Sequence, residues 1–367
     1  MHVVQLLPAL NEGGVERGVV EINRELVKRG IKNTVISAGG RLAAQIVIDG
    51  GHHVTFDVKS KNPLTVPWRV RKLRKLINRL NPDILHVRSR VPAWLVHFAN
   101  KNPRRPVVST AHGFNSVSAY SRIMTRADLV ICGSGAVIDH IRKAYDTPPS
   151  LIRLVHRGID AETFDPERLN QQFIDEFRQR YDLNGKYVIL AVGRITSWKG
   201  YAELIEAVAK AATYLPPYRL VIVGGVQEGQ EGYAAELREQ AKRLGIGDTV
   251  VFAGSQTNMA EIYHMADVVV SNCTSKPETF GRTMVEALVM ERPVIATAHG
   301  GALDIMREGL TGWLLQPGDT ARLAEILKEA PGKKFNSLRD YALENFSLGA
   351  MVEHNLAIYN EVLELYK

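Results

Sequence analysis

Short, mostly apolar runs alternate with amphipathic stretches along the chain, and this alternation is the first structural signal in the sequence. Apolar runs of about four to eight residues are typical of buried strands, whereas apolar residues that recur every three or four positions are typical of helices. In the first half we expect strands over residues 3–7, 33–37, 54–57, 84–87, 107–110 and 129–132, and helices over 15–29 and 68–80. Strands that alternate with helices favour a parallel α/β sheet.

The second half repeats this rhythm after a polar, proline-containing stretch at residues 160–166. There we expect strands over 187–192, 218–223, 250–252, 268–271 and 294–296, and helices over 201–212 and 233–244. We therefore predict an α/β protein of two Rossmann-like, doubly wound parallel-sheet domains, residues 1–165 and 166–349. A last helix within residues 350–367 follows, and we leave open whether it packs on the first domain. Ligands of such sheets lie at the carboxyl ends of the strands, so two domains facing each other would enclose a central cleft.

Length and composition narrow the class of protein. At 367 residues the chain exceeds the size at which one core usually stops growing, and 45% hydrophobic with 23% charged residues excludes a disordered or fibrous protein. Cys132 and Cys273 are far apart, so we expect neither a disulfide framework nor a structural zinc site. No apolar run approaches the roughly 20 residues of a transmembrane helix, and the N-terminus does not resemble a signal peptide. We expect a cytoplasmic protein.

Charge is divided unevenly along the chain. The net charge is +14 over residues 1–160 and −7 over residues 161–367, which together give the +7 of the whole chain. The densest basic segment, residues 68–80, carries six Lys and Arg residues and no acid, at the spacing of an amphipathic helix. This pattern indicates either a helix that contacts an anionic membrane surface or an ordinary domain helix with a solvated basic face. No recognised nucleic-acid-binding motif accompanies the charge, so we expect no nucleic-acid partner.

Two glycine-containing loops between a strand and a helix are candidates for anion binding. Gly13 and Gly14 follow the first strand and open a helix whose free amides can face an anion, although the dinucleotide fingerprint G-x-G-x-x-G is missing. Arg194 and Lys199 lie on a loop that also holds two glycines. A planar guanidinium beside a compact ammonium suits a diphosphate.

The strongest motif is a pair of carboxylates, Glu278 and Glu286, placed around the start of a helix. Carboxylates accept hydrogen bonds from neutral hydroxyls, so this pair is typical of a site that holds sugar and ribose hydroxyls. Gly281, between them, lets the backbone approach a ligand. The strand over 268–271 precedes the pair and Gly300-Gly301 follows the next strand.

These motifs resemble those of the family 4 retaining glycosyltransferases of the GT-B fold. Glu278 and Glu286 match the family's E-x7-E motif. The other matches lie at Gly193-Arg194, Lys199-Gly200, Pro293-Val294, Gly300-Gly301, 309–312 and 317–319, and more loosely at Gly13-Gly14, 83–86, His112-Gly113 and 158–160. The resemblance implies a hexosyl-type glycosyltransferase that retains anomeric configuration, similar to the bacterial enzymes that assemble lipopolysaccharide cores and surface glycans.

The resemblance also implies where a nucleotide diphosphate sugar would bind. Glu286 would hold the ribose, while Glu278 and the amides near Phe280 and Gly281 would hold the transferred sugar. The β-phosphate would be stabilised by the cations and the helix start already described, at Arg194, Lys199, Gly13 and Gly14.

Three further residues join this predicted site. His112 would contact the hydroxyls of the donor sugar from the first domain, and Arg157, just before Gly158, would lie among the donor-binding residues. Gln256, in the loop after the strand at 250–252, is our candidate for a contact with the nucleotide base. No Asp-x-Asp occurs in the chain, so we expect no metal or other cofactor, with cations in the role of a metal, and we name no catalytic base.

Two arginines, Arg88 and Arg90, follow the strand over 84–87, where an acceptor would enter. We hypothesise that one of them binds a carboxylate or phosphate of an anionic glycolipid or glycan acceptor, the alternative being surface arginines without a partner. Together with the basic segment, this favours an enzyme at the inner face of the cytoplasmic membrane. Two other interpretations stay open: a nucleotide-sugar epimerase on the same scaffold, and a non-catalytic sugar- or lipid-binding protein.

Overall fold

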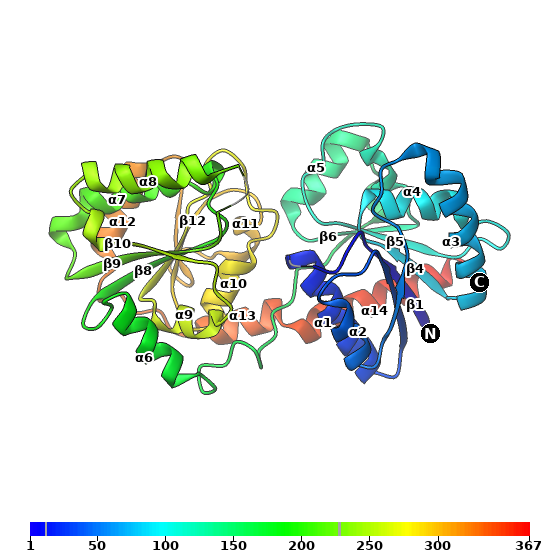
Figure 1. Ribbon diagram of the computed structural model, residues 1–367, viewed down its shortest axis with the longest axis horizontal. Helices are drawn as coiled ribbons and strands as arrows, with labels where there is room; N and C mark the ends of the chain where they lie inside the picture. The colour runs from blue at the N-terminus through cyan, green and yellow to red at the C-terminus, as the bar shows by residue number, and fades with distance from the viewer. Residues whose placement is uncertain (12, 227–228) are drawn as a thin grey trace. The chain divides into compact units, whose positions relative to one another are not determined.

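The computed structural model describes residues 1–11, 13–226 and 229–367, which fold into two compact units (Figure 1). The first unit comprises Met1–Gly158 and Leu348–Lys367, and the second comprises Ile159–Ser347. The sequence placed the change of domain at 165/166, seven residues later. Ile159 belongs to the second unit because its backbone amide donates to the carbonyl of Phe346 at 2.8 Å. None of the described helices combines the length and the apolar character that a membrane-spanning helix requires.

The first unit is built on a parallel sheet of seven strands in the order β3-β2-β1-β4-β5-β6-β7. Its strands are β1 (His2–Leu6), β2 (Lys32–Ser37), β3 (His52–Thr55), β4 (Ile84–Val87), β5 (Val107–Ala111), β6 (Leu129–Cys132) and β7 (Ile152–Leu154). Its α-helices are α1 (Gly14–Lys28), α2 (Ala43–Ile48), α3 (Val66–Leu80), α4 (Arg90–Ala99), α5 (Gly135–Tyr145) and α14 (Leu348–Glu364).

Helices cover both faces of this sheet. On one face, α3 and α4 pack against β1 and β4 through side chains that include Leu73 and Ile77. On the opposite face, α1 and the C-terminal helix α14 (red in Figure 1) pack through side chains that include Leu26 and Tyr359. The C-terminal segment therefore completes the core of the first unit.

Helix α3 contains the basic segment, and its apolar stripe packs on the sheet as in an ordinary domain helix. Arg69, one of its six basic residues, is only 1% exposed and donates to Oγ1 of Thr65 at 3.0 Å. The five others are exposed: Arg71, Lys72, Arg74, Lys75 and Arg79. Burial of Arg69 was not predicted, because helical spacing alone did not show that the preceding turn wraps over this side chain.

The second unit is built on a parallel sheet of six strands in the order β10-β9-β8-β11-β12-β13. Its strands are β8 (Tyr187–Val192), β9 (Tyr218–Val223), β10 (Val250–Gly254), β11 (Val268–Ser271), β12 (Val294–Thr297) and β13 (Gly312–Leu315). Its α-helices are α6 (Gln171–Arg180), α7 (Tyr201–Ala211), α8 (Glu231–Arg243), α9 (Met259–Met265), α10 (Arg282–Val289), α11 (Ala302–Ile305), α12 (Thr320–Glu329) and α13 (Leu338–Phe346). Helices α7, α8 and α12 cover one face, and α9, α10 and α13 cover the other (Figure 1).

Both sheets confirm the predicted doubly wound, parallel architecture. Every strand expected from the sequence is present to within two residues, whereas β7, β13 and several helices were not expected. Helix α4 is an example of a helix that was not expected. Arg90–Ala99 is apolar on most sides, so its sequence lacks the polar face by which an amphipathic helix is recognised.

In each sheet, the strand order reverses beside the unit's first strand. This switch point lies between β1 and β4 in the first unit and between β8 and β11 in the second. The loops that leave the two adjacent strands there run to opposite faces, which opens a crevice at their carboxyl ends. Ligands of doubly wound sheets bind in such crevices, so these two places are where functional residues are expected.

Candidate functional site

The loop after β8 is held in place by glycines whose backbone touches neighbouring loops. Gly193 has a φ of +150°, and a Cβ atom on Gly224 would lie 1.9 Å from its carbonyl oxygen. The Tyr201 hydroxyl donates to the same oxygen at 2.7 Å. Gly200 has a φ of +69°, and a Cβ there would lie 1.9 Å from the carbonyl oxygen of Asn272. Only glycine permits these approaches, so the loop that carries Arg194 and Lys199 has a defined path.

Lys199 and Glu278 form an ion pair between the loops after β8 and β11. Their side chains are 14% and 17% exposed, so the pair is largely shielded from water. The thiol of Cys273 lies 3.6 Å from Oε1 of Glu278. Burial and the nearby Glu278 raise the pKa of Cys273 to about 12, which keeps it a neutral donor. Two residues that the sequence assigned to one site are thus in direct contact.

The segment after Glu278 is fixed by the glycines that follow β12. The amide of Gly301 donates to the Glu278 carbonyl at 2.8 Å. A Cβ on Gly300 would lie 2.3 Å from that carbonyl oxygen, and one on Gly301 would lie 2.1 Å from the carbonyl oxygen of Phe280. The Phe280 side chain is buried in the core, with its ring centroid 5.8 Å from that of Phe346. Phe280 therefore anchors the loop, and only its backbone can serve a ligand.

Glu286 lies on the helix α10, which begins after Gly281 in a left-handed conformation with a φ of +102°. The Tyr263 hydroxyl donates to Oε2 of Glu286 at 2.9 Å, and Nε of Arg282 donates to Oε1 at 3.0 Å. Burial, followed by the charge of Glu286, raises the pKa of Tyr263 well above its usual value. A carboxylate oxygen can accept more than one hydrogen bond, so Glu286 has the chemistry to bind hydroxyl groups.

Arg194 and Gln256 lie at the carboxyl ends of β8 and β10, outside this group of contacts. The Arg194 side chain is exposed, and within the described part of the chain it makes no hydrogen bond or ion pair. Gln256 donates from Nε2 to the carbonyl of Ala253 at 2.6 Å. The structure joins neither residue to the Lys199–Glu278 pair.

Four predicted residues are in the first unit, and three of them lie together. The side chain of Arg157 donates to Nδ1 of His112 at 3.1 Å. A Cβ on Gly14 would lie 2.8 Å from Nη1 of Arg157. Gly13 has a φ of +141° and precedes α1. Burial, and next the charges of Arg157 and Arg88, lower the pKa of His112 well below its usual value, so its imidazole is neutral.

A cavity of about 250 Å³ opens beside these residues, at the switch point between β1 and β4. It is lined by Pro8, Val15, Glu16, Arg88, Ser89, Arg90, Thr110, His112, Gly113, Asn115 and Met124. Its volume is close to the lower end, roughly 300 Å³, of small-molecule sites. Atom Nε2 of His112 is buried and has no hydrogen-bond partner among the described residues. Arg88 and Arg90, which the sequence singled out, therefore share a cavity with His112.

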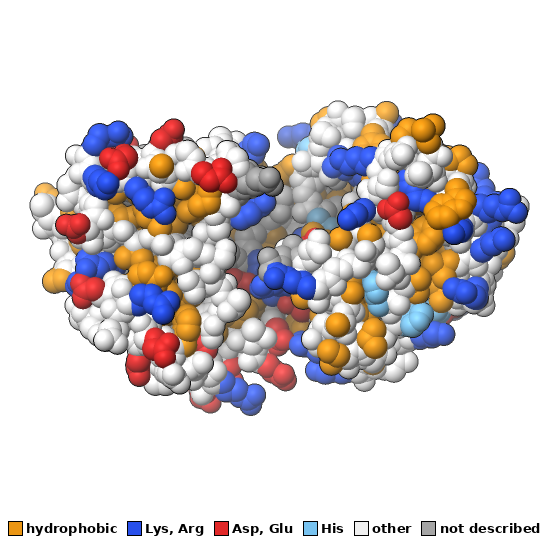
Figure 2. Space-filling model, in the orientation of Figure 1, with side chains coloured by type: hydrophobic (Ala, Val, Ile, Leu, Met, Phe, Trp, Pro, Cys, Tyr) orange, Lys and Arg blue, Asp and Glu red, His pale blue; other side chains and the backbone are white. Residues whose placement is uncertain are grey.

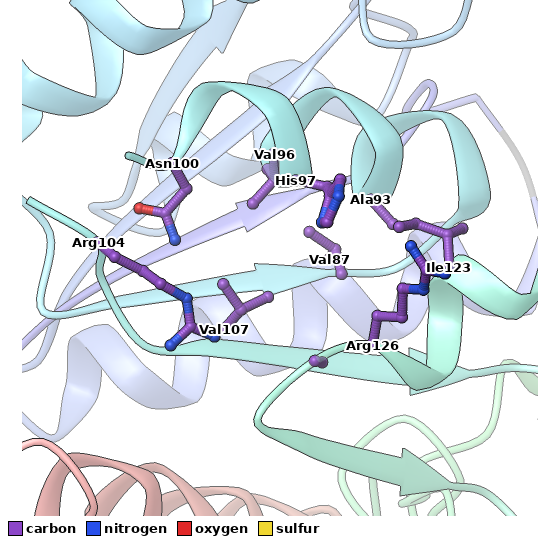
Figure 3. A pocket seen from close by; sticks show the side chains of 10 residues that line it. Val87, Ala93, Val96, His97, Asn100, Arg104, Val107, Ile123 and Arg126 are labelled. Carbon is purple, nitrogen blue, oxygen red and sulfur yellow. The ribbon is translucent and has the colours of Figure 1, made fainter. Parts of the chain in front are cut away.

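A second cavity in the first unit does not fit a substrate. It measures about 60 Å³ and lies between α4 and the strands β4 and β5, with His97 among apolar side chains and Arg104 and Arg126 at its edges (Figure 3). This volume holds no more than a few water molecules. Within the described ranges, no three His, Cys, Asp or Glu side chains are grouped as metal ligands would be.

Sequence reasoning missed three residues of the second unit. Arg282 stands four positions before Glu286 on one helix, a spacing that favours an ion pair and could have been recognised. Tyr263 reaches Glu286 from α9, which no local pattern predicts. His299 forms a hydrogen bond with the backbone of Cys273. Its buried Nε2 has no partner among the described residues. Burial lowers the pKa of His299, although the charge of Glu278 acts to raise it.

Two protein families match the chain, one on each unit. The family described as Glycosyltransferase Family 4 matches residues 12–163, and the family described as Glycosyl transferases group 1 matches residues 173–342. Among curated relatives, a D-inositol 3-phosphate glycosyltransferase of Catenulispora acidiphila is 30% identical over 68% of this chain and 60% of its own length. An N-acetyl-alpha-D-glucosaminyl L-malate synthase of Bacillus anthracis is 25% identical over 94% of both chains.

Solved structures agree with the fold. A glycosyltransferase from Rickettsia africae superimposes with a TM-score of 0.87 and 28% identity, over 99% of this chain and 98% of that one. The HepE protein of Anabaena, solved with UDP and glucose, has a TM-score of 0.81 and 23% identity, over 98% of this chain and all of that one. Since the two families together match most of the chain and the architecture agrees, the protein belongs to the glycosyltransferases of the GT-B type, with a family 4 domain followed by a group 1 domain.

Proposed function

We propose that this glycosyltransferase moves a hexose from a nucleoside diphosphate sugar to a glycolipid or polysaccharide precursor, with retention of anomeric configuration and without a metal ion. The observation that carries the proposal is the ion pair of Lys199 and Glu278 at the switch point of the second unit. It brings a cation and a hydroxyl acceptor together at the carboxyl ends of adjacent strands, and Glu286 lies on the helix α10 that follows the same loop. The Anabaena protein solved with UDP and glucose has the same fold, which supports such a donor.

The roles of the residues follow from their chemistry. Glu286, held by Tyr263 and Arg282, offers acceptor positions to a ribose. Glu278 and the adjacent amides would hold the transferred sugar, and Lys199 with Arg194 would face the diphosphate. Arg194 is exposed, so its side chain would move to contact a bound diphosphate. Lys199 already neutralises Glu278, so it would share its charge between Glu278 and the diphosphate.

The reaction breaks the bond between the anomeric carbon and the β-phosphate oxygen, and forms one between that carbon and an acceptor oxygen. The acceptor proton would pass to the leaving phosphate, since no catalytic base is assigned. Lys199 and Arg194 would stabilise the charge that develops on the phosphate, a contribution that grows in a site shielded from water.

The names of the two curated relatives include inositol 3-phosphate and L-malate. Each of these molecules carries at least one anionic group and at least one hydroxyl. They support an anionic acceptor here, which agrees with the two arginines that line the cavity of the first unit.

We also propose that the basic face of α3 brings the enzyme to the inner face of the cytoplasmic membrane. Five basic side chains of α3 are exposed, and beside them Leu64 and Trp68 are 87% and 58% exposed. An apolar pocket of about 280 Å³, lined in part by Trp94 and Phe98, lies next to this face. Figure 2 shows hydrophobic side chains gathered among Lys and Arg over the region of α3 and α4. Exposed apolar groups within a basic face are typical of helices that lie on anionic membranes.

The donor reaction is tested by incubating the full chain with UDP-, GDP- and ADP-hexoses and measuring release of the nucleoside diphosphate, with and without EDTA. Glu278→Gln and Lys199→Met should each lower the turnover with the active donor by at least about a hundredfold. Glu236→Gln and Lys210→Met remove the same charges from exposed positions of α8 and α7 and should leave turnover unchanged. Turnover that needs a divalent metal, or that survives both site variants, would contradict the proposal. Proton NMR of the product reports the anomeric configuration.

Membrane contact is tested by flotation with vesicles of neutral lipid alone or mixed with about 30% anionic lipid, a composition that attracts polybasic segments. The triple variant Arg71→Gln, Lys72→Gln, Lys75→Gln should lose the salt-sensitive binding of the wild type. The matched triple variant Lys210→Gln, Lys242→Gln, Arg243→Gln on the second unit should keep it. Equal flotation of the two variants would exclude α3 as the contact.

A further inference from the structure

The first unit contains a buried arginine without an acidic partner. Arg88 is 6% exposed. Its Nε donates to Oε1 of Gln5 at 2.8 Å, and Nη2 lies 3.5 Å from Nδ1 of His86. Among the described residues no carboxylate forms an ion pair with Arg88. Its partners are neutral, so its charge is not compensated within the described part of the chain.

A chain of buried amides holds this guanidinium in place. Gln5 donates from Nε2 to Asn33 at 3.1 Å, and Asn33 donates to Asn23 at 2.7 Å. Asn23 in turn donates to the carbonyl of Ile46 at 3.1 Å. Each amide both donates and accepts, so the network fixes the orientation of Gln5 and, through it, of Arg88. A network of this kind is preorganised for a ligand rather than formed around one.

On the other side of Arg88, two hydrogen bonds fix His86. Its Nε2 and the hydroxyl of Thr110 are 2.7 Å apart, and its Nδ1 and the hydroxyl of Tyr359 are also 2.7 Å apart. Burial, and next the charge of Arg88, lower the pKa of His86 well below its usual value, so this histidine adds no second charge. Arg88 is thus surrounded by oriented, uncharged groups from β1, β5 and α14.

Burial of an unpaired charge is expensive. Burial also lowers the pKa of Arg88, but an arginine stays protonated in proteins, so the cost is not relieved by loss of the proton. Such a charge stays costly unless a partner of opposite charge compensates it. A chain that keeps Arg88 at the wall of a cavity therefore has a use for its charge there.

The other groups around the cavity are also suited to an anion. Arg90 lines it and donates to the Ser121 hydroxyl at 3.1 Å. Because Nδ1 of His112 accepts a hydrogen bond from Arg157, the proton of the neutral ring is on Nε2, the buried atom without a partner among the described residues. Glu16 is the acidic residue among those that line the cavity, and among the described residues it forms no ion pair with Arg88.

We propose that Arg88, Arg90 and His112 form an oxyanion subsite in the first unit, which receives a phosphate or carboxylate group of the acceptor. The identity of the bound molecule as the acceptor rests on the proposed function, whereas binding of the oxyanion does not. Arg88 supplies a fixed, desolvated charge, Arg90 supplies a second, more mobile one, and His112 donates one hydrogen bond. A neutral acceptor would leave Arg88 uncompensated, so the subsite selects anionic acceptors.

The subsite is tested on the full chain without any nucleotide sugar. Inorganic phosphate and succinate are titrated separately by isothermal calorimetry at constant ionic strength, with chloride as the balancing anion. We expect saturable binding of at least one of them by the wild type, and a Kd at least tenfold higher for Arg88→Met and for Arg90→Gln. Arg142→Met, which removes an exposed arginine of α5, should keep the wild-type Kd.

Arg88→Met removes the charge and leaves a smaller, apolar side chain, and its unfolding midpoint is measured beside that of the wild type, first without added anion. Phosphate should raise the midpoint of the wild type and leave that of Arg88→Met unchanged. If Arg88→Met does not fold, Arg88→Lys, which keeps the charge but not the fork, and Arg90→Gln decide the question. No saturable binding by the wild type, or equal binding by the wild type and the Arg88 and Arg90 variants, would overturn the subsite.

The same variants separate the subsite from the proposed function. Nucleoside diphosphate binding to the second unit should be the same in Arg88→Met and the wild type. Arg88-dependent phosphate binding in a protein that transfers no sugar would leave the subsite standing and remove the transferase proposal. Sugar transfer by Arg88→Met with an unchanged acceptor KM would remove the subsite and leave the transferase proposal standing.

Discussion

The surroundings of Glu286 decide what this residue can contribute. The sequence identifies a glutamate on a helix, but Tyr263 and Arg282 determine its geometry, since each binds one of its two carboxylate oxygens. The Glu286 side chain is 11% exposed, and its carboxylate is held in a fixed orientation. Its position and orientation are therefore set by these two side chains and not by the helix alone.

Replacement of Tyr263 by Phe should cost more stability than replacement of another buried or half-buried tyrosine. Tyr263→Phe removes a hydrogen bond to a charged group, worth about 1.5–3 kcal/mol, whereas Tyr341→Phe removes one to the carbonyl of Ile305, worth about 1 kcal/mol. Urea unfolding of both variants measures the difference. Equal losses would show that Glu286 finds another partner when the hydroxyl is removed.

The buried histidines of the first unit predict a loss of stability in acid. The pKa of His86 is well below its usual value because of burial, so between that pKa and about 6.5 the unfolded chain binds more protons than the folded one. The free energy of unfolding should therefore fall as the pH falls below about 6.5, by up to about 1.4 kcal/mol per pH unit for this group.

His86→Gln should reduce this slope in urea titrations between about pH 7.5 and about pH 5, a range that spans the ordinary histidine pKa of about 6.5. His354→Gln, at an exposed position of α14, is the control and should leave the slope as in the wild type. A slope that stays the same in His86→Gln would assign the acid sensitivity to other groups.

At the scale of elements, the site depends on loops whose backbones touch. The segment from Glu278 to Phe280 lies against Gly300 and Gly301, and the loop after β8 lies against Gly224 and Asn272. These contacts join loops from adjacent strands, so the positions of Lys199 and Glu278 are set by the sheet. The glycines were visible in the sequence, whereas the atoms that exclude a side chain from each of them were not.

Addition of one methyl group should lower the stability at these loop glycines and raise it at a glycine on an exposed helix. Gly301→Ala places a Cβ against the carbonyl of Phe280 and should destabilise the second unit by about 1–3 kcal/mol, while weakening donor binding. Gly232→Ala, on α8 with no atom within 4 Å of the new Cβ, should stabilise it by about 0.5–1 kcal/mol. Thermal unfolding of both variants gives the two signs, and a stable Gly301→Ala would show that the loop relaxes freely.

At the scale of the whole molecule, the first unit is built from two segments that lie at opposite ends of the chain. The chain leaves the first unit at Gly158, builds the second, and returns with α14 to complete the first. Helix α14 contributes Val352, Tyr359 and Val362 to the core, each fully buried. The Tyr359 hydroxyl also reaches His86, next to Arg88. The last helix thus supports the cavity of the first unit.

Deletion of residues 348–367 should therefore unfold the first unit selectively. Without α14, the apolar face that includes Val3 and Leu26 is exposed to water. Hydrogen exchange should then show loss of amide protection in β1, β4 and β5, with β8, β11 and β12 still protected. Deletion of residues 365–367 alone, beyond α14, should leave both units protected, and loss of protection throughout the protein would show that the two units fold as one.

The sequence by itself determined the architecture and the family of this protein. Apolar runs and helical periods depend on local spacing, so most strands of both sheets, all except β7 and β13, and their parallel arrangement could be predicted from them. The motifs at Glu278, Glu286, Arg194 and Lys199 depend on residue type and position, which is why the glycosyltransferase resemblance was visible before the fold.

Only the tertiary structure decided which residues act together. Contacts such as Tyr263 with Glu286, Lys199 with Glu278 and Gln5 with Arg88 join segments that lie far apart in the chain, and no local pattern encodes them. Burial, which turns Arg88 from a surface arginine into an uncompensated charge, is likewise a property of the packed sheet and helices. The chemistry of a site depends on distance and on exclusion of water, and both are set by the fold.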